Sequence, residues 1–96
     1  MFYVYLLKNN YDKIYIGYSG DLRKRFKDHN YGRVKSTKMG KPWKLVYYEA
    51  FLSGKDAKIR ESTLKNYGST LGQLKKRINN SLVINLSAWI NLNQYW

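Results

Sequence analysis

The side chains best suited to chemistry gather between residues 14 and 29, in the run IYIGYSGDLRKRFKDH. Tyr15 contributes a phenol, which can stack on a base, bond a phosphate, or act as an acid or a base. Arg25 and His29 follow it, one helical turn apart, and contribute a permanent cation and an ionisable imidazole. We therefore expect a functional site in this short stretch.

A strand, a tight turn and a helix must position these groups. The strand ends at a glycine, and Asp21 can then accept the free backbone N–H groups of a helix that begins at Leu22. At 100° per residue, Leu22 and Phe26 fall within about 40° of each other and form the buried stripe of that helix. Arg25 and His29 border the stripe, so they are held more firmly than surface charges would be.

The residues before this stretch predict a β-hairpin. Residues 2–8 and 13–18 are rich in β-branched and aromatic residues, and the polar residues 9–12 between them are typical of a turn. Side chains alternate between the two faces of a strand, so matching the aliphatic faces of the two strands places Tyr5 and Tyr15 on the same side of the sheet.

A carboxylate stands at an apolar position later in the chain. The S-x-x-D spacing of residues 53–56 is that of a capping box and predicts a helix that starts within it. On that helix Ala57, Glu61 and Leu64 fall within about 60° of each other. Glu61 is costly there unless a cation meets it, which can be a neighbouring Arg or Lys or a divalent metal ion. Arg60 points about 100° away and is a poor partner.

The chain is strongly basic, with 18 Lys plus Arg against 6 Asp plus Glu and a formal charge of +12 over 96 residues. Self-repulsion of this size costs stability unless an anionic partner neutralises it, and nucleic acid is the first candidate. A lysine-rich loop over residues 31–44, with Ser36 and Thr37 among its lysines, suits phosphate contacts, although a solvated charged loop has the same composition. The cations expected to contact nucleic acid are Arg23, Lys24, Lys35, Lys38 and Lys41.

The last part of the chain differs from the rest because residues 79–96 have no charged side chain. A third strand is expected over residues 45–51, and a second capping box predicts a short helix over residues 70–78, where the charged domain of residues 1–78 ends. The alternation of apolar residues in the C-terminal extension favours a strand over a helix. Such a strand should pack on the domain or on a partner, including a second copy of the chain.

The chain contains no Cys, which excludes disulfides, thiolate metal sites and a cysteine nucleophile. Its apolar start, residues 1–7, has no basic leader and is too short for a signal peptide or a membrane span. A cytoplasmic protein without a membrane partner is therefore expected.

Taken together, these motifs resemble the GIY-YIG nuclease family over about residues 2–78, in the pattern of its small stand-alone members. Tyr3 stands where the family name has Gly, and Asp21 stands where many members have Asn. Some members also use an Asn beyond the glutamate helix, for which Asn66, Asn79 and Asn80 are candidates. The matching motifs are Tyr3-Val4-Tyr5, Tyr15-Ile16-Gly17, Asp21-Leu22 with Arg25 and His29, and Arg60-Glu61.

The resemblance implies an α/β (α+β) domain in which about three helices flank a central three-stranded antiparallel sheet. It also implies phosphodiester cleavage supported by one divalent metal ion, Mg²⁺ or Mn²⁺. Tyr5 and Tyr15 would border the reacting phosphate, and one of them would help to deprotonate the attacking water. Arg25 would bind the phosphate, His29 would assist nearby, and Glu61 would hold the metal.

Our leading interpretation is a metal-dependent endonuclease that acts on DNA, with RNA left open, and that is structure-guided or weakly sequence-specific. The few scattered acids are poorly suited to a two-metal site. The alternative is a nucleic-acid-binding module that retains the fold with little or no catalysis. A third interpretation is a basic protein that acts through its apolar C-terminal residues, as a subunit or at a membrane surface.

Overall fold

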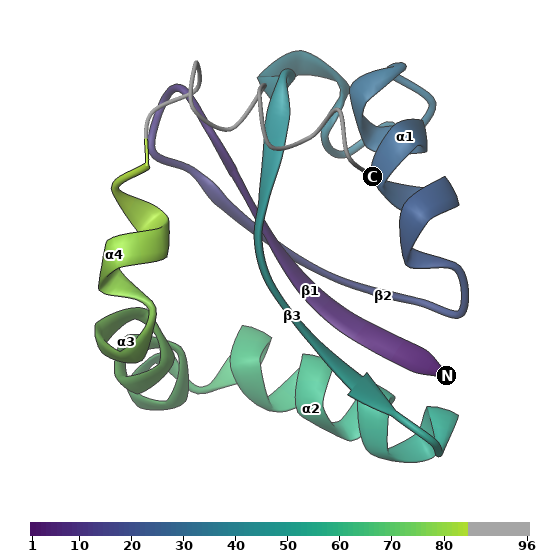
Figure 1. The fold of residues 1–96 in the computed structure, drawn as a ribbon, viewed down its shortest axis with the longest axis vertical. Coiled ribbons are helices and arrows are strands. Elements are labelled where there is room, and N and C mark those ends of the chain that lie inside the picture. The colour runs from purple at the N-terminus through teal and green to yellow at the C-terminus, as the bar shows by residue number, and fades with distance from the viewer. Residues whose placement is uncertain (85–96) are drawn as a thin grey trace.

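The computed structural model describes residues 1–84, and a three-stranded antiparallel sheet forms its centre (Figure 1). The strand order is β2-β1-β3. The strands are β1 (Phe2–Asn9), β2 (Ile14–Ser19) and β3 (Trp43–Phe51). The helices are α1 (Leu22–Asn30), α2 (Gly54–Asn66), α3 (Gly68–Arg77) and the short α4 (Asn79–Leu82), with a 3₁₀ turn, η1, over Lys38–Gly40. The predicted fold class is confirmed.

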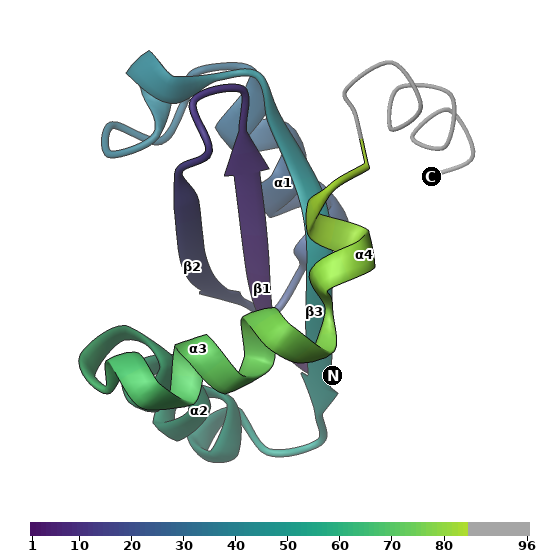
Figure 2. The same cartoon turned by 90° about the vertical axis from the view of Figure 1, so that its left-hand side faces the viewer.

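The sheet divides the hydrophobic core into two layers. Val4 and Leu6 of β1 are fully buried on the face that α2 and α3 cover. Tyr5 and Leu7 point to the opposite face, which α1 covers. Figure 2 shows this arrangement, with α1 behind the sheet and α3 in front of it. The alternation is the one expected from the sequence, and it places both Tyr5 and Tyr15 on the α1 side.

The hairpin between β1 and β2 turns where the polar residues predicted it. The Asn9 side-chain oxygen accepts the backbone N–H groups of Tyr11 and Lys13, both at 3.0 Å. Asp12 has a φ of 60°, a left-handed conformation that Asp tolerates better than most residues. The Asn9 amide donates to the Gly40 carbonyl at 3.0 Å, so this one side chain ties the hairpin to the loop before β3.

Helix α1 begins as its sequence predicts. The Asp21 carboxylate accepts the backbone N–H of Lys24 at 3.1 Å, and Leu22 and Phe26 are both buried against the sheet. The following strand, β3, starts at Trp43, two residues before the predicted residue 45, because Trp43 is buried and pairs with Asn9 of β1. The loop between α1 and β3 is therefore pinned at both ends.

Helices α2 and α3, on the face of the sheet opposite to α1, differ in how well their starts were predicted. Helix α2 begins at Gly54, and the Ser53 hydroxyl caps it by accepting the Asp56 N–H, as expected. Helix α3 begins at Gly68, so the prediction of a capping box at Thr70 was wrong. The Thr70 N–H donates instead to the Tyr67 carbonyl at 3.0 Å, because the helix has already begun there.

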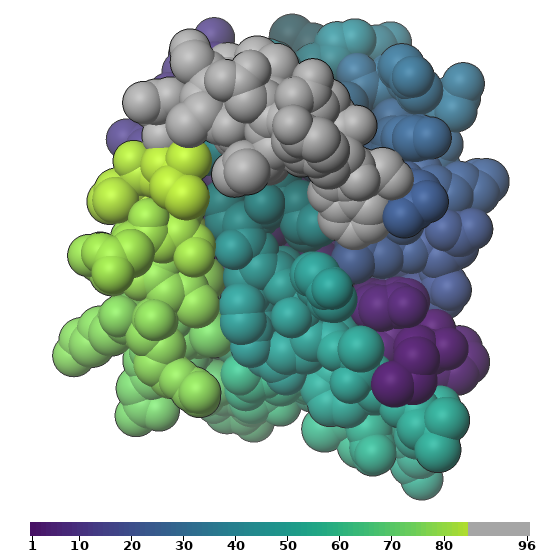
Figure 3. Space-filling view, in the orientation of Figure 1, coloured from purple at the N-terminus to yellow at the C-terminus, as the bar shows by residue number. Residues whose placement is uncertain are grey.

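The short helix α4 lies beside β3, as Figure 3 shows on the surface. The Lys8 ammonium donates to the Leu82 carbonyl at 2.6 Å, and the Lys44 ammonium donates to the Ile84 carbonyl. The strand predicted in the uncharged extension does not start at its beginning, because Asn79–Leu82 is helical. Residues 85–96 lie outside the described residues. Within residues 1–84, no helix is both long and apolar enough to span a membrane.

Candidate functional site

The candidate site is built around Tyr5, which crosses from the central strand over β2. Tyr5 pairs with Gly17 in the sheet. A Cβ atom added to Gly17 would lie 2.3 Å from Tyr5 Cζ and 2.4 Å from its hydroxyl oxygen. No other residue type leaves room for the phenol at this position, which gives the glycine of the second motif a physical role.

His29 holds the hydroxyl of Tyr5. The Tyr5 oxygen and His29 Nε2 are 2.7 Å apart, which is a short hydrogen bond between two buried groups. The Tyr15 ring stands edge-on to the imidazole with 4.9 Å between the ring centroids, and the centroids of the two tyrosine rings are 6.4 Å apart. The hairpin and α1 thus bring Tyr5, Tyr15 and His29 into direct contact.

Thr37 completes this group from the loop between α1 and β3. Its hydroxyl oxygen lies 2.7 Å from His29 Nδ1, and its backbone carbonyl accepts the indole N–H of Trp43 at 2.8 Å. Thr37 is buried, so the expectation that it shares the phosphate-contacting character of the loop was wrong. Nothing in the local sequence marks Thr37 as a site residue, because its partners His29 and Trp43 come near it only in the folded loop.

The site residues form two layers that differ in exposure. The buried layer consists of Tyr5, His29 and Thr37, which are respectively 0%, 0% and 1% exposed. The outer layer consists of Tyr15, Arg25 and Glu61, which are all partly exposed.

Burial and neighbouring charges set the protonation of the buried layer. Burial raises the pKa of the Tyr5 phenol far above its ordinary value, and the nearby Tyr15 and Glu61 raise it further, while Arg25 opposes them through its hydrogen bond and charge. Burial lowers the pKa of His29 to about 4, and the positive charge of Arg25 acts in the same direction. At neutral pH both groups are therefore uncharged, and both feel the cation of Arg25.

Glu61 lies on α2, which covers the face of the sheet opposite to α1. Its negative charge acts on Tyr5, and its carboxylate also forms an ion pair with Lys65 of the same helix at 3.1 Å. Arg60 is not its partner, as expected, because the guanidinium binds the Glu49 carboxylate of β3 at 2.9 Å. That pair joins α2 to β3. Within residues 1–84, no three acidic, His or Cys side chains cluster as a metal site would.

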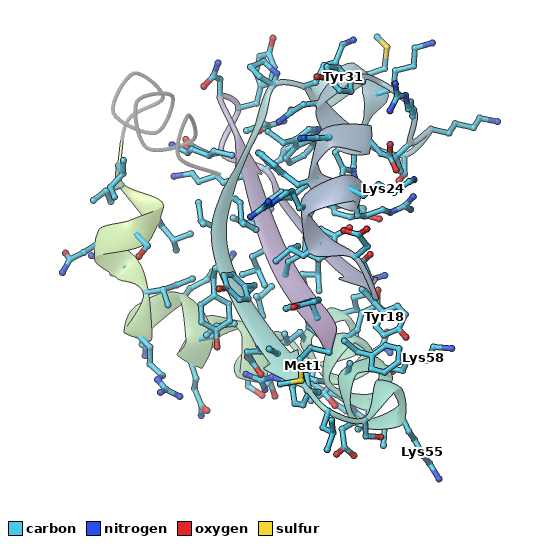
Figure 4. All side chains as sticks on the ribbon, turned by 45° about the vertical axis from the view of Figure 1, so that its right-hand side comes forward. Met1, Tyr18, Lys24, Tyr31, Lys55 and Lys58 are labelled. Atoms are coloured by element: carbon cyan, nitrogen blue, oxygen red, sulfur yellow. The ribbon has the colours of Figure 1, made fainter. Side chains whose placement is uncertain are left out.

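The predicted nucleic-acid contacts lie along α1 and the loop that follows it. Lys24 projects from α1, as Figure 4 shows, and its ammonium is 3.1 Å from Asp28, which also binds Arg33. These two hydrogen bonds lower the pKa of Asp28, so its carboxylate stays charged. Arg23 is exposed and helps to line a 240 Å³ hollow at the start of α1. The loop lysines Lys35, Lys38 and Lys41 are all exposed.

Comparison with known proteins identifies relatives over most of the chain. A model of the GIY-YIG catalytic domain matches residues 1–72. A UPF0213 protein of Clostridium perfringens is 42% identical over 66 residues, which cover 68% of this chain and 71% of that protein. A UPF0213 protein of Staphylococcus epidermidis is 38% identical over 66 residues, covering 68% of this chain and 80% of that protein.

A solved structure agrees with this assignment. The solution NMR structure of a UPF0213 protein from Bacillus halodurans has 30% sequence identity and a TM-score of 0.50, covering 88% of this chain and 100% of that one. The matched region contains both tyrosine motifs, the α1 residues and Glu61. The chain therefore belongs to the GIY-YIG nuclease family.

Proposed function

We propose that this protein is a metal-dependent endonuclease that hydrolyses phosphodiester bonds in DNA, with structure-guided or weakly sequence-specific targeting. The observation that supports this most is the contact of Tyr5, Tyr15 and His29 beside Arg25 and the charge of Glu61. Membership of a nuclease family and a charge of +12 support a nucleic-acid substrate.

Tyr15, rather than Tyr5, faces the substrate in this proposal. Tyr5 has no exposed surface, shares a 2.7 Å hydrogen bond with the buried imidazole of His29, and has a pKa raised by burial. The nearby Tyr15 also opposes ionisation of Tyr5. Tyr15 is partly exposed and is therefore the group that, as a phenolate beside the Arg25 cation, accepts the proton of the attacking water and becomes a neutral phenol.

Arg25 and Glu61 complete the outer layer. The Arg25 guanidinium binds the phosphate and offsets the negative charge that develops on it. Glu61 supplies the hard oxygen ligands that Mg²⁺ or Mn²⁺ prefers, and Mg²⁺ can be held by one carboxylate when waters and substrate phosphate provide its other ligands. The donor set thus fits one hard divalent ion, and Lys65 must then release Glu61. A bound ion would supply Lewis acidity at the phosphate.

The buried layer positions the outer one. Tyr5 and His29 do not touch the substrate in this assignment, but they support the Tyr15 ring, whose centroid lies 4.9 Å from that of His29. The exposed loop lysines and Arg23 bind flanking phosphates. Lys24 attracts the phosphates more weakly, because its ammonium is paired with Asp28.

The test is a cleavage assay on labelled duplex, nicked, branched and single-stranded DNA, with matched RNA strands. The proposal predicts cleavage that requires Mg²⁺ or Mn²⁺, that stops on chelation with EDTA, and that is strongest on one DNA structure. Cleavage that is unaffected by EDTA would contradict the metal role, and cleavage of RNA alone would contradict the substrate.

The ion pair of Glu61 with Lys65 favours a second candidate, a nucleic-acid-binding module with little catalysis. This candidate predicts binding that weakens steeply as salt rises, with no metal-dependent product. A Lys65→Met variant separates the two. If the protein is a metal-dependent nuclease, the release of Glu61 should raise its affinity for Mn²⁺. If it is only a binding module, its affinity for Mn²⁺ should stay unchanged.

A further inference from the structure

A continuous chain of hydrogen bonds runs from Tyr5 through His29 to the loop before β3. The Tyr5 hydroxyl contacts His29 Nε2 at 2.7 Å, and His29 Nδ1 contacts the Thr37 hydroxyl at 2.7 Å. The Thr37 hydroxyl has one further partner, the Val34 carbonyl, at 3.4 Å. Neutral imidazole has one N–H, so the proton on His29 sits either on Nδ1 or on Nε2, and the chain can run in two directions.

The donors and acceptors around Tyr5, His29 and Thr37 favour one of the two directions. If Nε2 had the proton, it would donate to the Tyr5 oxygen, which Arg25 also approaches as a donor. The Tyr5 O–H would then lack an acceptor, because His29 is the partner that the Tyr5 hydroxyl has among residues 1–84 besides the donor Arg25, and a buried O–H without an acceptor is costly. If Nδ1 has the proton, Tyr5 donates to Nε2, Nδ1 donates to Thr37, and Thr37 donates to Val34, which satisfies all three.

We propose that Thr37 is a positioning residue that holds His29 in the Nδ1–H tautomer, so that Nε2 accepts the Tyr5 hydroxyl and aims that phenol. The Val34 carbonyl can only accept, so it turns the Thr37 proton away from the imidazole and leaves the Thr37 oxygen to accept from Nδ1. The consequence for catalysis rests on the proposed function, because it acts through the edge-on contact between the His29 and Tyr15 rings.

The loop holds the Thr37 hydroxyl in a fixed place. Its backbone carbonyl accepts the Trp43 indole N–H at 2.8 Å, and its backbone N–H donates to Val34 at 3.1 Å. Three residues further on, Gly40 is bound by Asn9 of the hairpin. The exposed lysines Lys35 and Lys38 flank this anchored segment, so the loop combines a buried structural contact with a charged surface.

The wild-type protein gives the first test. The chain contains a single histidine, so ¹⁵N labelling of histidine reports the two ring nitrogens of His29 alone. At pH 7, Nδ1 is expected to have the chemical shift and one-bond proton coupling of a protonated nitrogen, and Nε2 those of an unprotonated one. The reverse assignment overturns the proposal, whether or not the protein cleaves any nucleic acid.

A set of isosteric variants gives the second test. Thr37→Val removes the hydroxyl at constant shape, and the two nitrogen shifts should move toward each other as the tautomers mix. Thr37→Ser keeps the hydroxyl and should keep the wild-type shifts. Thr70→Val makes the same chemical change on α3 and should leave the spectrum unchanged. Wild-type shifts in a folded Thr37→Val protein would overturn the proposal, and if that variant does not fold, tautomer mixing in Thr37→Ser would overturn it instead.

Single-turnover and steady-state cleavage provide the functional readout. Thr37→Val is expected to lower kcat at least about tenfold while KM for the labelled DNA changes less than about twofold, and Thr37→Ser is expected to restore kcat. An unchanged kcat in Thr37→Val would overturn the catalytic consequence. Absence of cleavage by the wild type would contradict the proposed function, and the NMR result would still decide the role of Thr37.

Discussion

The buried and outer layers of the site are built by different physical means. Tyr5, His29 and Thr37 are fully enclosed, and each is fixed by hydrogen bonds of 2.7 Å to the next. Tyr15, Arg25 and Glu61 are partly exposed, and Glu61 has an ion-pair partner on its own helix rather than across the site. The protein itself completes the buried layer, whereas in the proposed function substrate and metal complete the outer layer.

This difference assigns separate duties to residues of similar chemistry. The two tyrosines belong to two motifs of the same family and contact the same histidine. Burial nevertheless keeps Tyr5 protonated, whereas Tyr15 is partly exposed. Changes in the outer layer should therefore reduce chemistry at constant stability. Changes in the buried layer should reduce stability together with activity.

Glu61→Gln should have the largest effect on cleavage. The amide keeps the shape of the carboxylate but loses the charge that would hold a divalent ion, so the rate should fall by roughly 100-fold or more. DNA binding and the unfolding midpoint should stay near those of the wild type. Rates measured under single-turnover conditions at saturating Mg²⁺ check this. A matched substitution outside the site, Asp56→Asn, should leave the rate unaffected, and equal losses in both variants would refute the assignment.

Gly17→Ala should have the largest effect on stability. The added Cβ would lie 2.3 Å from Tyr5 Cζ and must displace the buried phenol, at a cost of about 1 to 3 kcal/mol. Gly72→Ala is the control, because it adds a methyl group on α3 with nothing within 4 Å. That change should stabilise the helix by about 0.5 to 1 kcal/mol. Urea titration of both variants measures the opposite signs, and the same sign for both would contradict the packing.

The pH dependence of stability should report on the buried layer. His29 takes up a proton near pH 6.5 when the chain is unfolded but only near pH 4 when it is folded, because burial favours the neutral ring. The stabilisation is therefore complete above pH 6.5 and is lost as the pH falls toward 4. About 1 to 3 kcal/mol is expected from this group. In a His29→Gln variant the loss of stability at low pH should be smaller by that amount. Urea titrations at a series of pH values measure this loss. Identical pH profiles for the variant and the wild type would argue against a buried neutral imidazole.

The loop lysines should show the smallest effect. Replacing Lys35 and Lys38 by Gln should weaken DNA binding and reduce the dependence of log K on log salt by about one for each phosphate that the variant no longer neutralises. Lys75 and Lys76 of α3 are exposed cations on the other face, and the same double change there should have a smaller effect. Equal effects would mean that total charge, not its position, governs binding.

Most of the fold could be predicted because its signals are local. The Asp21 cap, the Leu22 and Phe26 stripe and the alternation in β1 each depend on neighbours within a few residues. The start of α3 could not be predicted, since backbone N–H groups at its first turn bond to Tyr67 without a side-chain cap.

The sequence predicted that Tyr5, Tyr15 and His29 lie together, but not which of them are buried and which are partly exposed. Burial of Tyr5 depends on the absent side chain of Gly17 on the neighbouring strand, a contact that no spacing in the sequence reveals. Thr37 was missed as a site residue for the same reason, because its partners are residues 29 and 43, brought together only by the folded loop.

The division of labour between the two tyrosines is tested most directly by comparing the single-turnover cleavage rates of Tyr15→Phe and Tyr5→Phe on the same DNA, with the stability of each variant measured alongside. We predict that Tyr15→Phe loses roughly 100-fold or more in rate at wild-type stability. Tyr5→Phe should lose less in rate but about 1 to 3 kcal/mol in stability, because His29 Nε2 is left without its donor. A Tyr15→Phe protein that cleaves at the wild-type rate, while Tyr5→Phe is folded and inactive, would contradict the account.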